Sequence, residues 1–461
     1  MTPKVLQHIP SVSELLEIQP LRGLVDRLNR NVVVSGVRTA LDELRREARA
    51  AAGEAKLPDL RELAERIARR IAEGEQPAPR PVINATGVLL HAGLGSAPLS
   101  DDALESLVAV GRSYANLEFD LTSGAPAPRE AAVEPLLRLL SGAEAALVVN
   151  TSAAALHLAL AALAGGREVV VSRQDMGEVD GCRLTDLAAG ATLREVGAVH
   201  KCRVADYAAA IGPDTAALLC VQPTSWRASG DVERPTTPEL VRLGQQHGLP
   251  VVVAAGYAAL AGEFGELGGP TAAQLVADGA DIVIASGSDL LGGPQCGLLV
   301  GRRELLDRLA RFPLARALHV DKLTLAALAA TLRAWQEPAA AERALPILHL
   351  LHTPLDNLRN RAERLAAQLG ARPSFARAEA VADEAFLSGH AVAELRLRSW
   401  CVAVEPAAES AEALAELLRL GQPAVVARVA GGRVLLDLRS VLARQDQEIA
   451  QAFARLMPTA G

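Results

Sequence analysis

Two stretches of this chain place hydroxyl groups directly after a strand-like apolar run, where they could hold an anion. Residues 145–149 (AALVV) lead into Asn150, Thr151 and Ser152, which open a helix-like segment. In open α/β sheets, ligands bind at the carboxyl ends of strands, often against the first N–H groups of a helix. Thr151 and Ser152 therefore predict an anion cradle, although the same residues also suit an ordinary helix N-cap.

The second stretch combines hydroxyls, a carboxylate and glycines. Ser286, Ser288 and Asp289 follow the apolar run 281–286, and three glycines lie within the segment 286–295. Glycine lets the backbone approach a ligand closely, so these side chains are candidates for the same ligand pocket. The glycine-rich motifs of ATP and dinucleotide sites are missing, and so is the GxSxG motif of α/β hydrolases.

The elements that must position these residues fall into three regions. Residues 1–75 have helical periodicity and predict a small N-terminal domain, followed by a proline-rich linker at 76–81. From 82 to 315, apolar strand-like runs alternate with helical segments, which predicts a mostly parallel sheet covered by helices on both faces. Residues 316–461 predict an α+β C-terminal domain.

Composition and charge exclude several classes of protein. Half of the residues are hydrophobic and the formal net charge is −7, which argues against a generally basic nucleic-acid coat. The five cysteines are scattered and show no metal-binding spacing, so they predict free thiols in a reducing compartment. No signal-peptide pattern or long uninterrupted apolar run is present, and we expect a cytoplasmic protein that does not enter a membrane.

Several motifs resemble those of bacterial selenocysteine synthase, L-seryl-tRNA(Sec) selenium transferase. The likeness runs in order along essentially the whole chain. Its clearest stretches are VINATGVLLHAGLGSAPLS (82–100), NLEFDL (116–121), SGSDLLGGPQCGLLVGRRELL (286–306), RALHVDKLTLAALAATLRAW (316–335) and VLLDLRSVL (434–442). The resemblance implies a fold-type I pyridoxal-phosphate architecture, an N-terminal domain that contacts tRNA, and a homo-oligomer built from dimers.

The same resemblance places Asp289 where the family's lysine holds pyridoxal phosphate as a Schiff base. A carboxylate cannot form an imine with an aldehyde, so the covalent anchor is lost. Ala254 stands where the family has the aspartate that pairs with the pyridinium nitrogen. We therefore predict no catalytic residue at either position and no cofactor, although the family uses pyridoxal phosphate.

Other polar positions of the family pattern also differ. The family's arginine-rich loop corresponds to residues 124–129, where Arg129 alone remains as a candidate anion ligand. The chain has four lysines, Lys4, Lys56, Lys201 and Lys322, of which Lys201 is the one candidate to replace the missing amine. Neither His91 nor His200 has a visible carboxylate partner, and no residue spacing predicts a metal site.

Three functional hypotheses follow from the resemblance and from these differences. The first is a pseudoenzyme that acts by binding or assembly, with tRNA(Sec) or a lysine-containing homologue as possible partners. The second is an enzyme of altered chemistry that uses the same pocket without a Schiff base. The third is a working selenium transferase that converts seryl-tRNA(Sec) to selenocysteinyl-tRNA(Sec) with an unusual lysine or one supplied by a partner chain.

Overall fold

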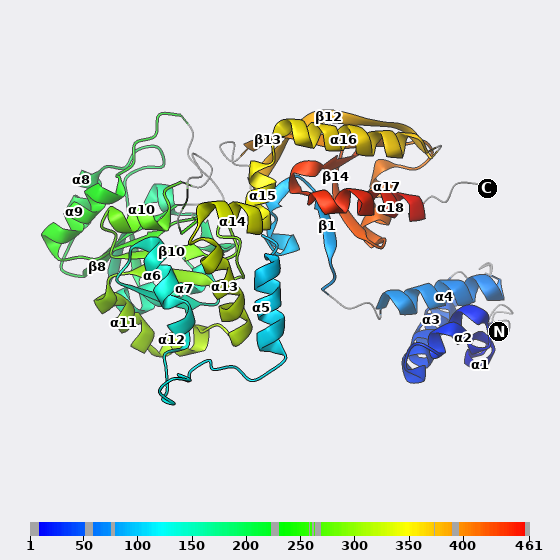
Figure 1. Ribbon diagram of the computed structural model, residues 1–461, viewed down its shortest axis with the longest axis horizontal. Helices are drawn as coiled ribbons and strands as arrows, with labels where there is room; N and C mark the ends of the chain where they lie inside the picture. Colours follow the sequence, from blue (N-terminus) through cyan, green and yellow to red (C-terminus); the bar gives the residue numbers. More distant parts are fainter. Residues whose placement is uncertain are drawn as a thin grey trace. The chain divides into compact units, whose positions relative to one another are not determined.

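The computed structural model describes residues 9–50, 59–74, 79–222, 230–257, 259–260, 262, 269–372, 374–389 and 396–456 (Figure 1). The chain divides into two units, Met1–Pro81 and Val82–Gly461. Part of the predicted linker, residues 76–78, lies outside the described residues.

The first unit is a small helical domain. Ser11 begins α1 with a capping box, because its hydroxyl accepts from the Glu14 N–H and the Glu14 carboxylate accepts from the Ser11 N–H. Leucine, valine and isoleucine side chains recur at helical spacing and form the unit's own buried core. The helices are α1 (Val12–Leu16), α2 (Gln19–Val25), α3 (Arg30–Ala50) and α4 (Leu60–Gly74).

The second unit contains a seven-stranded sheet with the order β3-β11-β10-β9-β8-β4-β7. All neighbouring pairs from β10 to β7 are parallel, whereas β11 runs antiparallel to both of its neighbours. The strands are β3 (Ala145–Val149), β4 (Glu168–Ser172), β7 (Thr192–Val196), β8 (Thr215–Val221), β9 (Val251–Ala254), β10 (Ile282–Ser286) and β11 (Gly297–Gly301).

Helices cover both faces of this sheet, which is why every position of its central strands is buried. Two separate hydrophobic clusters lie on the two faces. One includes residues of α6 (Glu134–Ser141), α9 (Thr237–His247) and α13 (Lys322–Ala334), and the other includes α7 (Ser152–Ala164) and α11 (Arg303–Arg311). The predicted α/β class, with a mostly parallel sheet between helices, is confirmed.

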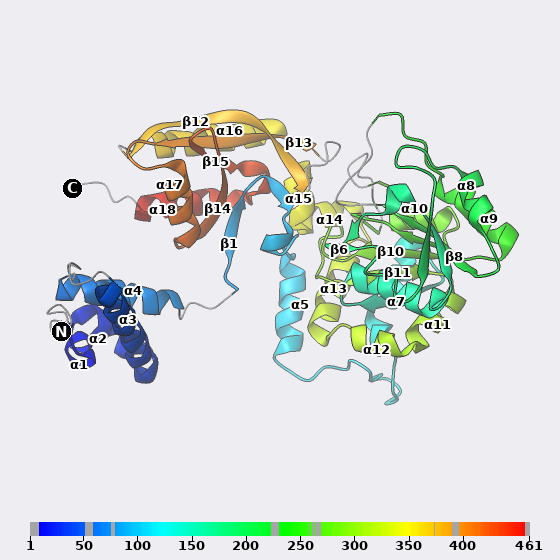
Figure 2. The same ribbon diagram turned by 180° about the vertical axis from the view of Figure 1, so that it is seen from behind.

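A second, six-stranded sheet has the order β1-β14-β15-β13-β12-β2. Helices α16 (Leu355–Gly370), α17 (Ala411–Leu420) and α18 (Asp446–Leu456) pack on it around their own core, as Figure 2 shows in yellow to red. The strands are β1 (Val82–Ala85), β2 (Val88–Leu90), β12 (Phe375–Ser388), β13 (Arg396–Pro406), β14 (Ala424–Ala430) and β15 (Arg433–Asp437).

Strands β1 and β2 therefore belong to the sheet of the C-terminal region, whereas the sequence analysis assigned residues from 82 onward to the large α/β domain. The register explains the difference, because β1 pairs in parallel with β14 and β2 pairs in parallel with the end of β12. This arrangement matters for the site, since it carries residues 90–96 from the early chain to the carboxyl ends of the large sheet.

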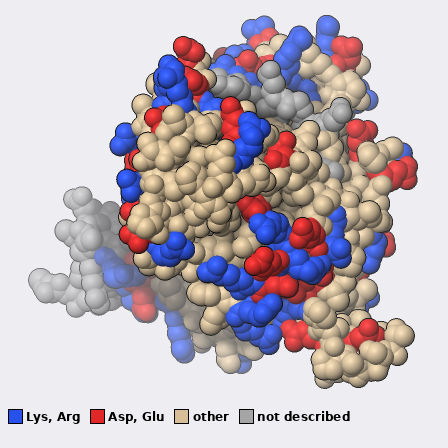
Figure 3. Space-filling model, turned by 90° about the vertical axis from the view of Figure 1, so that its left-hand side faces the viewer, with Lys and Arg blue, Asp and Glu red and all other residues tan. Residues whose placement is uncertain are grey.

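The charge on the surface and the lengths of the helices test two expectations from the sequence, that the protein has no generally basic coat and that it does not enter a membrane. On the face shown in Figure 3, Lys and Arg side chains are interspersed with Asp and Glu and do not gather into one basic patch. Within the described residues, no helix has the length and apolar character that crossing a membrane requires.

Gly297, the first residue of β11, allows the closest approach between the sheet and α7. A Cβ atom at this position would lie 2.0 Å from the Thr151 carbonyl oxygen and 2.8 Å from the Ser152 nitrogen, both of them backbone atoms. Gly297→Ala should therefore force β11 away from the first turn of α7 and lower the free energy of unfolding by about 3 kcal/mol. Thermal unfolding of the purified protein measures this loss.

The matched control is Gly212→Ala. A Cβ atom there meets no other atom within 4 Å, and its φ is not positive, so we expect a change within about 0.5 kcal/mol. Equal stability of the two variants would contradict the close approach at Gly297.

Candidate functional site

The residues that follow four strands of the large sheet line one cavity of about 620 Å³. These are the carboxyl ends of β3, β8, β9 and β10, the edge at which open α/β sheets bind ligands. The opposite wall comes from the second sheet, through His91 after β2 and Ser388 at the end of β12. The lining includes Leu90–Gly93, Gly95, Ser96, Thr151, Ser152, Val179–Gly181, Gln222, Ala254–Tyr257, Ile284, Ser286, Ser288, Asp289, Gln295, Cys296, Ser388 and Gly389.

The structure brings together most of the residues singled out from the sequence. Both predicted hydroxyl groups after β3 and both after β10 line the cavity, together with Asp289 and Ala254. The topology accounts for this, because parallel strands present their carboxyl ends at the same edge. The two segments, more than 130 positions apart in sequence, therefore form one site.

Arg129 is the exception, and the expectation that it lies with the other candidates is corrected. Its Nε donates to the Glu118 carboxylate at 3.0 Å and its Nη1 to the Val320 carbonyl at 2.7 Å. It lines a different hollow, beside α5 (Asp101–Gly111) and α13. The guanidinium thus holds an exposed loop against the start of α13 and does not reach the cavity.

The first turn of α7 is capped twice. The Thr151 hydroxyl accepts from the Ala154 N–H at 3.0 Å, as an N-cap residue should. The carboxylate of Asp180 accepts from the Ala153 N–H at 3.1 Å and also from the Ser152 hydroxyl. A negative group at this end of the helix is stabilised by free N–H groups and by the helix dipole. The anion at the predicted cradle is therefore a side chain of the protein itself.

Sequence reasoning missed Asp180, which lies at the turn between β5 (Glu178–Val179) and β6 (Cys182–Arg183). Its φ is 49° and that of Gly181 is 73°. The dipeptide Asp-Gly between two short strands is a signal for such a hairpin turn. That signal predicts the turn, but it does not predict that the turn meets α7.

Asp289 lies in the glycine-rich loop after β10, which backbone hydrogen bonds hold in place. The Gly287 N–H donates to the Cys296 carbonyl at 2.8 Å, and the Gly293 N–H donates to the Gly287 carbonyl at 2.8 Å. A Cβ at Gly287 would lie 2.4 Å from the Cys296 sulfur, so the loop needs glycine there. This packing fixes the position from which Asp289 faces the cavity.

The environment of Asp289 disfavours its negative charge. Burial raises the pKa of its carboxyl to about 7, and repulsion by the nearby Asp180 carboxylate acts in the same direction. A hydrogen bond from Ser286 opposes these effects. Asp289 is therefore a carboxyl that is about half protonated near neutral pH, with one hydrogen-bonding neighbour to support its ionised form.

The opposite wall carries two polar atoms that lack hydrogen-bond partners among the described residues. They are the hydroxyl of Ser388, a residue only 3% exposed, and Nδ1 of His91. Buried polar groups are usually paired, with protein or with water. Both atoms belong to residues that line the cavity, so a ligand could supply the missing partners.

Lysine is missing from the cavity lining within the described part of the chain. Lys201 is exposed and its Nζ lies 3.2 Å from the Glu233 carboxylate, outside the cavity. Lys322 donates to the Ser113 carbonyl at 2.6 Å, also outside it. The other two lysines, Lys4 and Lys56, lie outside the described residues. The geometry therefore does not bring Lys201 to the place of the missing amine.

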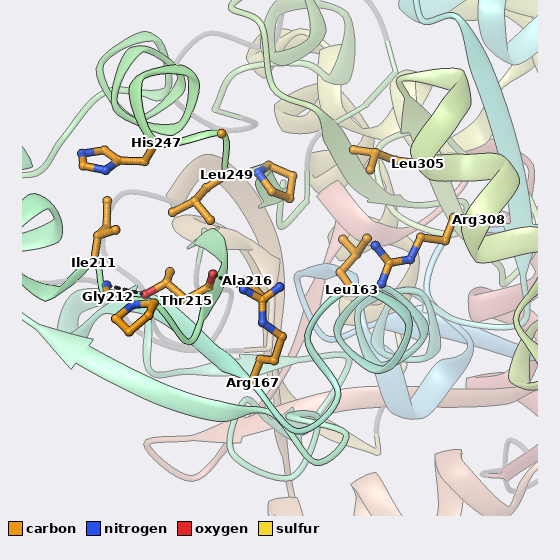
Figure 4. Close-up of a pocket in the computed structure, with 13 residues that line it drawn as sticks. Leu163, Arg167, Ile211, Gly212, Thr215, Ala216, His247, Leu249, Leu305 and Arg308 are labelled. Atoms are coloured by element: carbon orange, nitrogen blue, oxygen red, sulfur yellow. Dashed lines mark hydrogen bonds between the residues drawn. The ribbon is translucent and has the colours of Figure 1, made fainter.

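Another hollow lies at the opposite edge of the large sheet, where β8 and β9 begin (Figure 4). Its basic residues are Arg167, His247 and Arg308, all exposed. Arg167 donates to the Thr215 carbonyl at 2.7 Å and Arg308 donates to the Ala162 carbonyl, the latter near the end of α7. These guanidinium groups satisfy backbone carbonyls at element ends, which is a structural role.

A cluster in the second sheet has the donor types of a metal site. Ligand atoms of Asp383, Cys401 and Asp437 lie within 4.8 Å of one another. The Arg428 guanidinium already supplies a cation there, since it donates to Asp383 at 2.8 Å and lies 3.5 Å from the Asp437 carboxylate. The cluster is therefore an internal ion network of this sheet.

Comparisons with known proteins agree along the whole chain. A family model described as L-seryl-tRNA selenium transferase matches residues 82–442, and one described as selenocysteine synthase N terminal matches residues 6–45. The L-seryl-tRNA(Sec) selenium transferase of Moorella thermoacetica is 39% identical over 98% of this chain and 97% of its own length. The protein of the same name from Geobacter sulfurreducens is 39% identical, with 98% and 99% covered.

One solved structure supports the same fold class. D-Glucosaminate-6-phosphate ammonia-lyase superposes with a TM-score of 0.57 and 21% identity, covering 82% of this chain and 95% of its own. At that identity the match speaks for the fold alone. A serine palmitoyltransferase from Sphingomonas wittichii matches more weakly, with a TM-score of 0.42 and 16% identity, covering 82% and 88% of the two chains.

One prediction from the sequence is wrong. The analysis predicted no cofactor, whereas the selenium transferase family, which the matched family model and the full-length relatives show, points to pyridoxal phosphate. The error arose because the loss of a covalent anchor was treated as the loss of the group itself. A cavity can bind a cofactor without an imine.

The predicted resemblance is confirmed by two independent findings, the matched family models and the full-length relatives at 39% identity. This chain belongs to the L-seryl-tRNA(Sec) selenium transferase family.

Proposed function

We propose that this protein holds pyridoxal phosphate in the cavity by non-covalent contacts and does not itself perform the lysine-dependent transfer of its family. It acts by binding its ligand and by assembling with other chains. The observation that carries the proposal is Asp289, whose carboxyl faces the cavity from the glycine-rich loop where the family resemblance places the cofactor lysine.

The chemistry of the residue supports this proposal. Pyridoxal phosphate, when bound, supplies an electron sink, and its covalent attachment requires a primary amine. A carboxyl offers none, and neither described lysine lines the cavity. The residues therefore do not fit covalent attachment by this chain's described lysines.

Other residues of the cavity fit the group as a reversibly bound ligand. The hydroxyls of Thr151 and Ser152 and the first N–H groups of α7 are suited to a phosphate. A phosphate would compete with Asp180 for the Ser152 hydroxyl and the Ala153 N–H. The small side chain of Ala254 adds an apolar wall and offers no carboxylate to a pyridine nitrogen. Binding of this kind depends on hydrogen bonds and shape.

The competing proposal is an active selenium transferase. Identity of 39% over almost the full length of proteins with that name favours it. It requires an amine from another chain or from a lysine outside the described residues, because the described residues of this chain bring none to the cavity. An enzyme with altered chemistry in the same cavity remains a third hypothesis, although no specific contact favours it.

The partners follow from the family in the same way. We propose that the N-terminal unit, part of which the selenocysteine synthase N-terminal model matches, contacts tRNA(Sec). Assembly as a homo-oligomer of dimers, or with a lysine-containing homologue, would allow the chain to act through its neighbours. This protein would then contribute structure and ligand binding to a selenium transfer assembly.

The proposal predicts reversible binding of pyridoxal phosphate by the wild-type protein. After borohydride treatment, intact mass and peptide mapping should show no stoichiometric adduct, because Asp289 has no amine to fix. The double variant Asp289→Lys with Ala254→Asp should gain an adduct approaching one per chain, mapped to position 289.

Asp289→Asn is the matched control, since it keeps the size of the side chain and gains no reactive amine. It should give no adduct. A stoichiometric adduct in the wild-type protein, mapped to one of its lysines, would instead support the active transferase.

The pKa of Asp289 predicts how stability depends on pH. The folded chain keeps the proton up to about pH 7, whereas an unfolded chain releases it above about pH 4. Between these values the folded state binds more protons, so the contribution of Asp289 to stability falls as pH rises. Asp289→Asn should therefore be more stable than the ligand-free wild type by about 2–4 kcal/mol at pH 8, and nearly equal at pH 4.

Denaturant unfolding at the two pH values measures this difference. Asp175, whose pKa burial raises to about 6, is present in both proteins and cancels in the comparison. A difference that stayed the same from pH 4 to pH 8 would show that the Asp289 charge costs nothing.

A further inference from the structure

The cavity has an unusual balance of charge. Asp180 and Asp289 line it, and within the described residues no lysine or arginine does. Two carboxylates with no lysine or arginine beside them in the described lining favour a ligand group that carries a positive charge at the matching place.

The two carboxylates differ in how well the protein itself supports them. Asp180 accepts hydrogen bonds from the Ala153 N–H and the Ser152 hydroxyl at the start of α7, where the helix dipole also favours a negative charge. Asp289 is supported by Ser286 alone, and both burial and Asp180 disfavour its ionised form. Asp289 is thus the carboxylate whose ionised form a positive group of a ligand would stabilise most.

An independent observation also points to a ligand. Ser388 is only 3% exposed, lines the same cavity, and its hydroxyl has no hydrogen-bond partner among the described residues. The same holds for Nδ1 of His91, which lies beside it because Ser388 pairs with Leu90 in the register of β12 and β2. One wall therefore offers unused hydrogen-bonding atoms, and the other offers an uncompensated carboxylate.

Only some forms of the proposed cofactor would satisfy Asp289. An aldehyde or an alcohol brings no charge, whereas a primary ammonium group brings a positive charge and three N–H donors. Hydrogen bonds between charged partners are about twice as strong as those between neutral ones. The carboxyl that cannot react with an aldehyde is therefore well suited to bind an amine.

We infer that the cavity selects the amine form of the cofactor, pyridoxamine phosphate, and that the Asp289 carboxylate is the residue that recognises its ammonium group. This inference rests on the proposed function, namely that the cavity holds the cofactor reversibly. No bond is made or broken in the recognition step, and the phosphate is common to all forms of the cofactor. The discrimination therefore comes from the group that faces Asp289.

The test compares the dissociation constants of pyridoxamine phosphate and pyridoxine phosphate for the purified full-length protein, by calorimetry at pH 8. Pyridoxine phosphate is the better comparator than pyridoxal phosphate, because its hydroxyl is close in size to the amine and does not react with surface lysines. We expect the amine to bind at least about 10-fold more tightly to the wild type. In Asp289→Asn the two should bind within about 3-fold of each other.

Asp180→Asn is the matched control, since it removes the other carboxylate of the same cavity. It weakens the competitor for a phosphate at the start of α7, so both ligands should bind more tightly by a similar factor and the preference for the amine should persist. Loss of the preference for the amine in Asp180→Asn but not in Asp289→Asn would show that Asp180 recognises the ammonium group, and would contradict the inference.

The preference should also depend on pH. Protonation of Asp289 removes its charge, so the wild-type preference for the amine should shrink between pH 8 and pH 6. Asp180, His91, Tyr257 and Cys296 also line the cavity, and all four are present both in the wild type and in Asp289→Asn. Asp289→Asn should therefore bind with a ligand ratio that does not change over the same range.

The outcomes separate this inference from the proposed function. Equal binding of the two ligands by the wild type would overturn the inference and leave reversible cofactor binding in place. Binding of neither ligand, nor of pyridoxal phosphate, would overturn both. The wild-type comparison decides these cases even if a variant fails to fold, which circular dichroism would reveal.

Discussion

The chemistry of this site depends on a carboxyl group in a cavity whose described lining contains no lysine or arginine to balance its charge. The protein around Asp289 removes water, and Asp180 adds repulsion, so the pKa of the carboxyl rises to about 7. A buried charge without an opposite charge nearby raises the free energy of the folded protein. Such groups occur at functional sites, where a bound ligand can supply the opposite charge. Both the proposed non-covalent binding of the cofactor and the expected preference for an amine follow from this one group.

The fold holds that carboxyl in place through backbone contacts more than through side chains. The loop after β10 is fixed by hydrogen bonds between Gly287, Gly293 and Cys296, and Gly297 lets β11 lie against the start of α7. The glycines at 287, 293 and 297 are therefore needed for packing, whatever the chemistry of position 289.

The sequence predicted the parallel sheet and the polar strand ends because apolar runs and following hydroxyls are local patterns. It could not predict Asp180 as the cap of α7, since that contact joins a hairpin turn to a helix 28 positions earlier. Arg129 was misplaced because its partner, Glu118, lies in a loop whose path no periodicity reveals. The second wall was missed for a similar reason, since it depends on the pairing of β2 with β12.

The state of charge of Asp289 can be measured directly by infrared difference spectroscopy. The carboxylic-acid band of Asp289 is the one that is present in the wild type and missing from Asp289→Asn. In the ligand-free protein this band should disappear with a midpoint at about pH 7. With pyridoxamine phosphate bound, the midpoint should fall by at least about one pH unit, because the ammonium group stabilises the carboxylate. A midpoint near pH 4 in the ligand-free protein, unchanged by the ligand, would contradict the account.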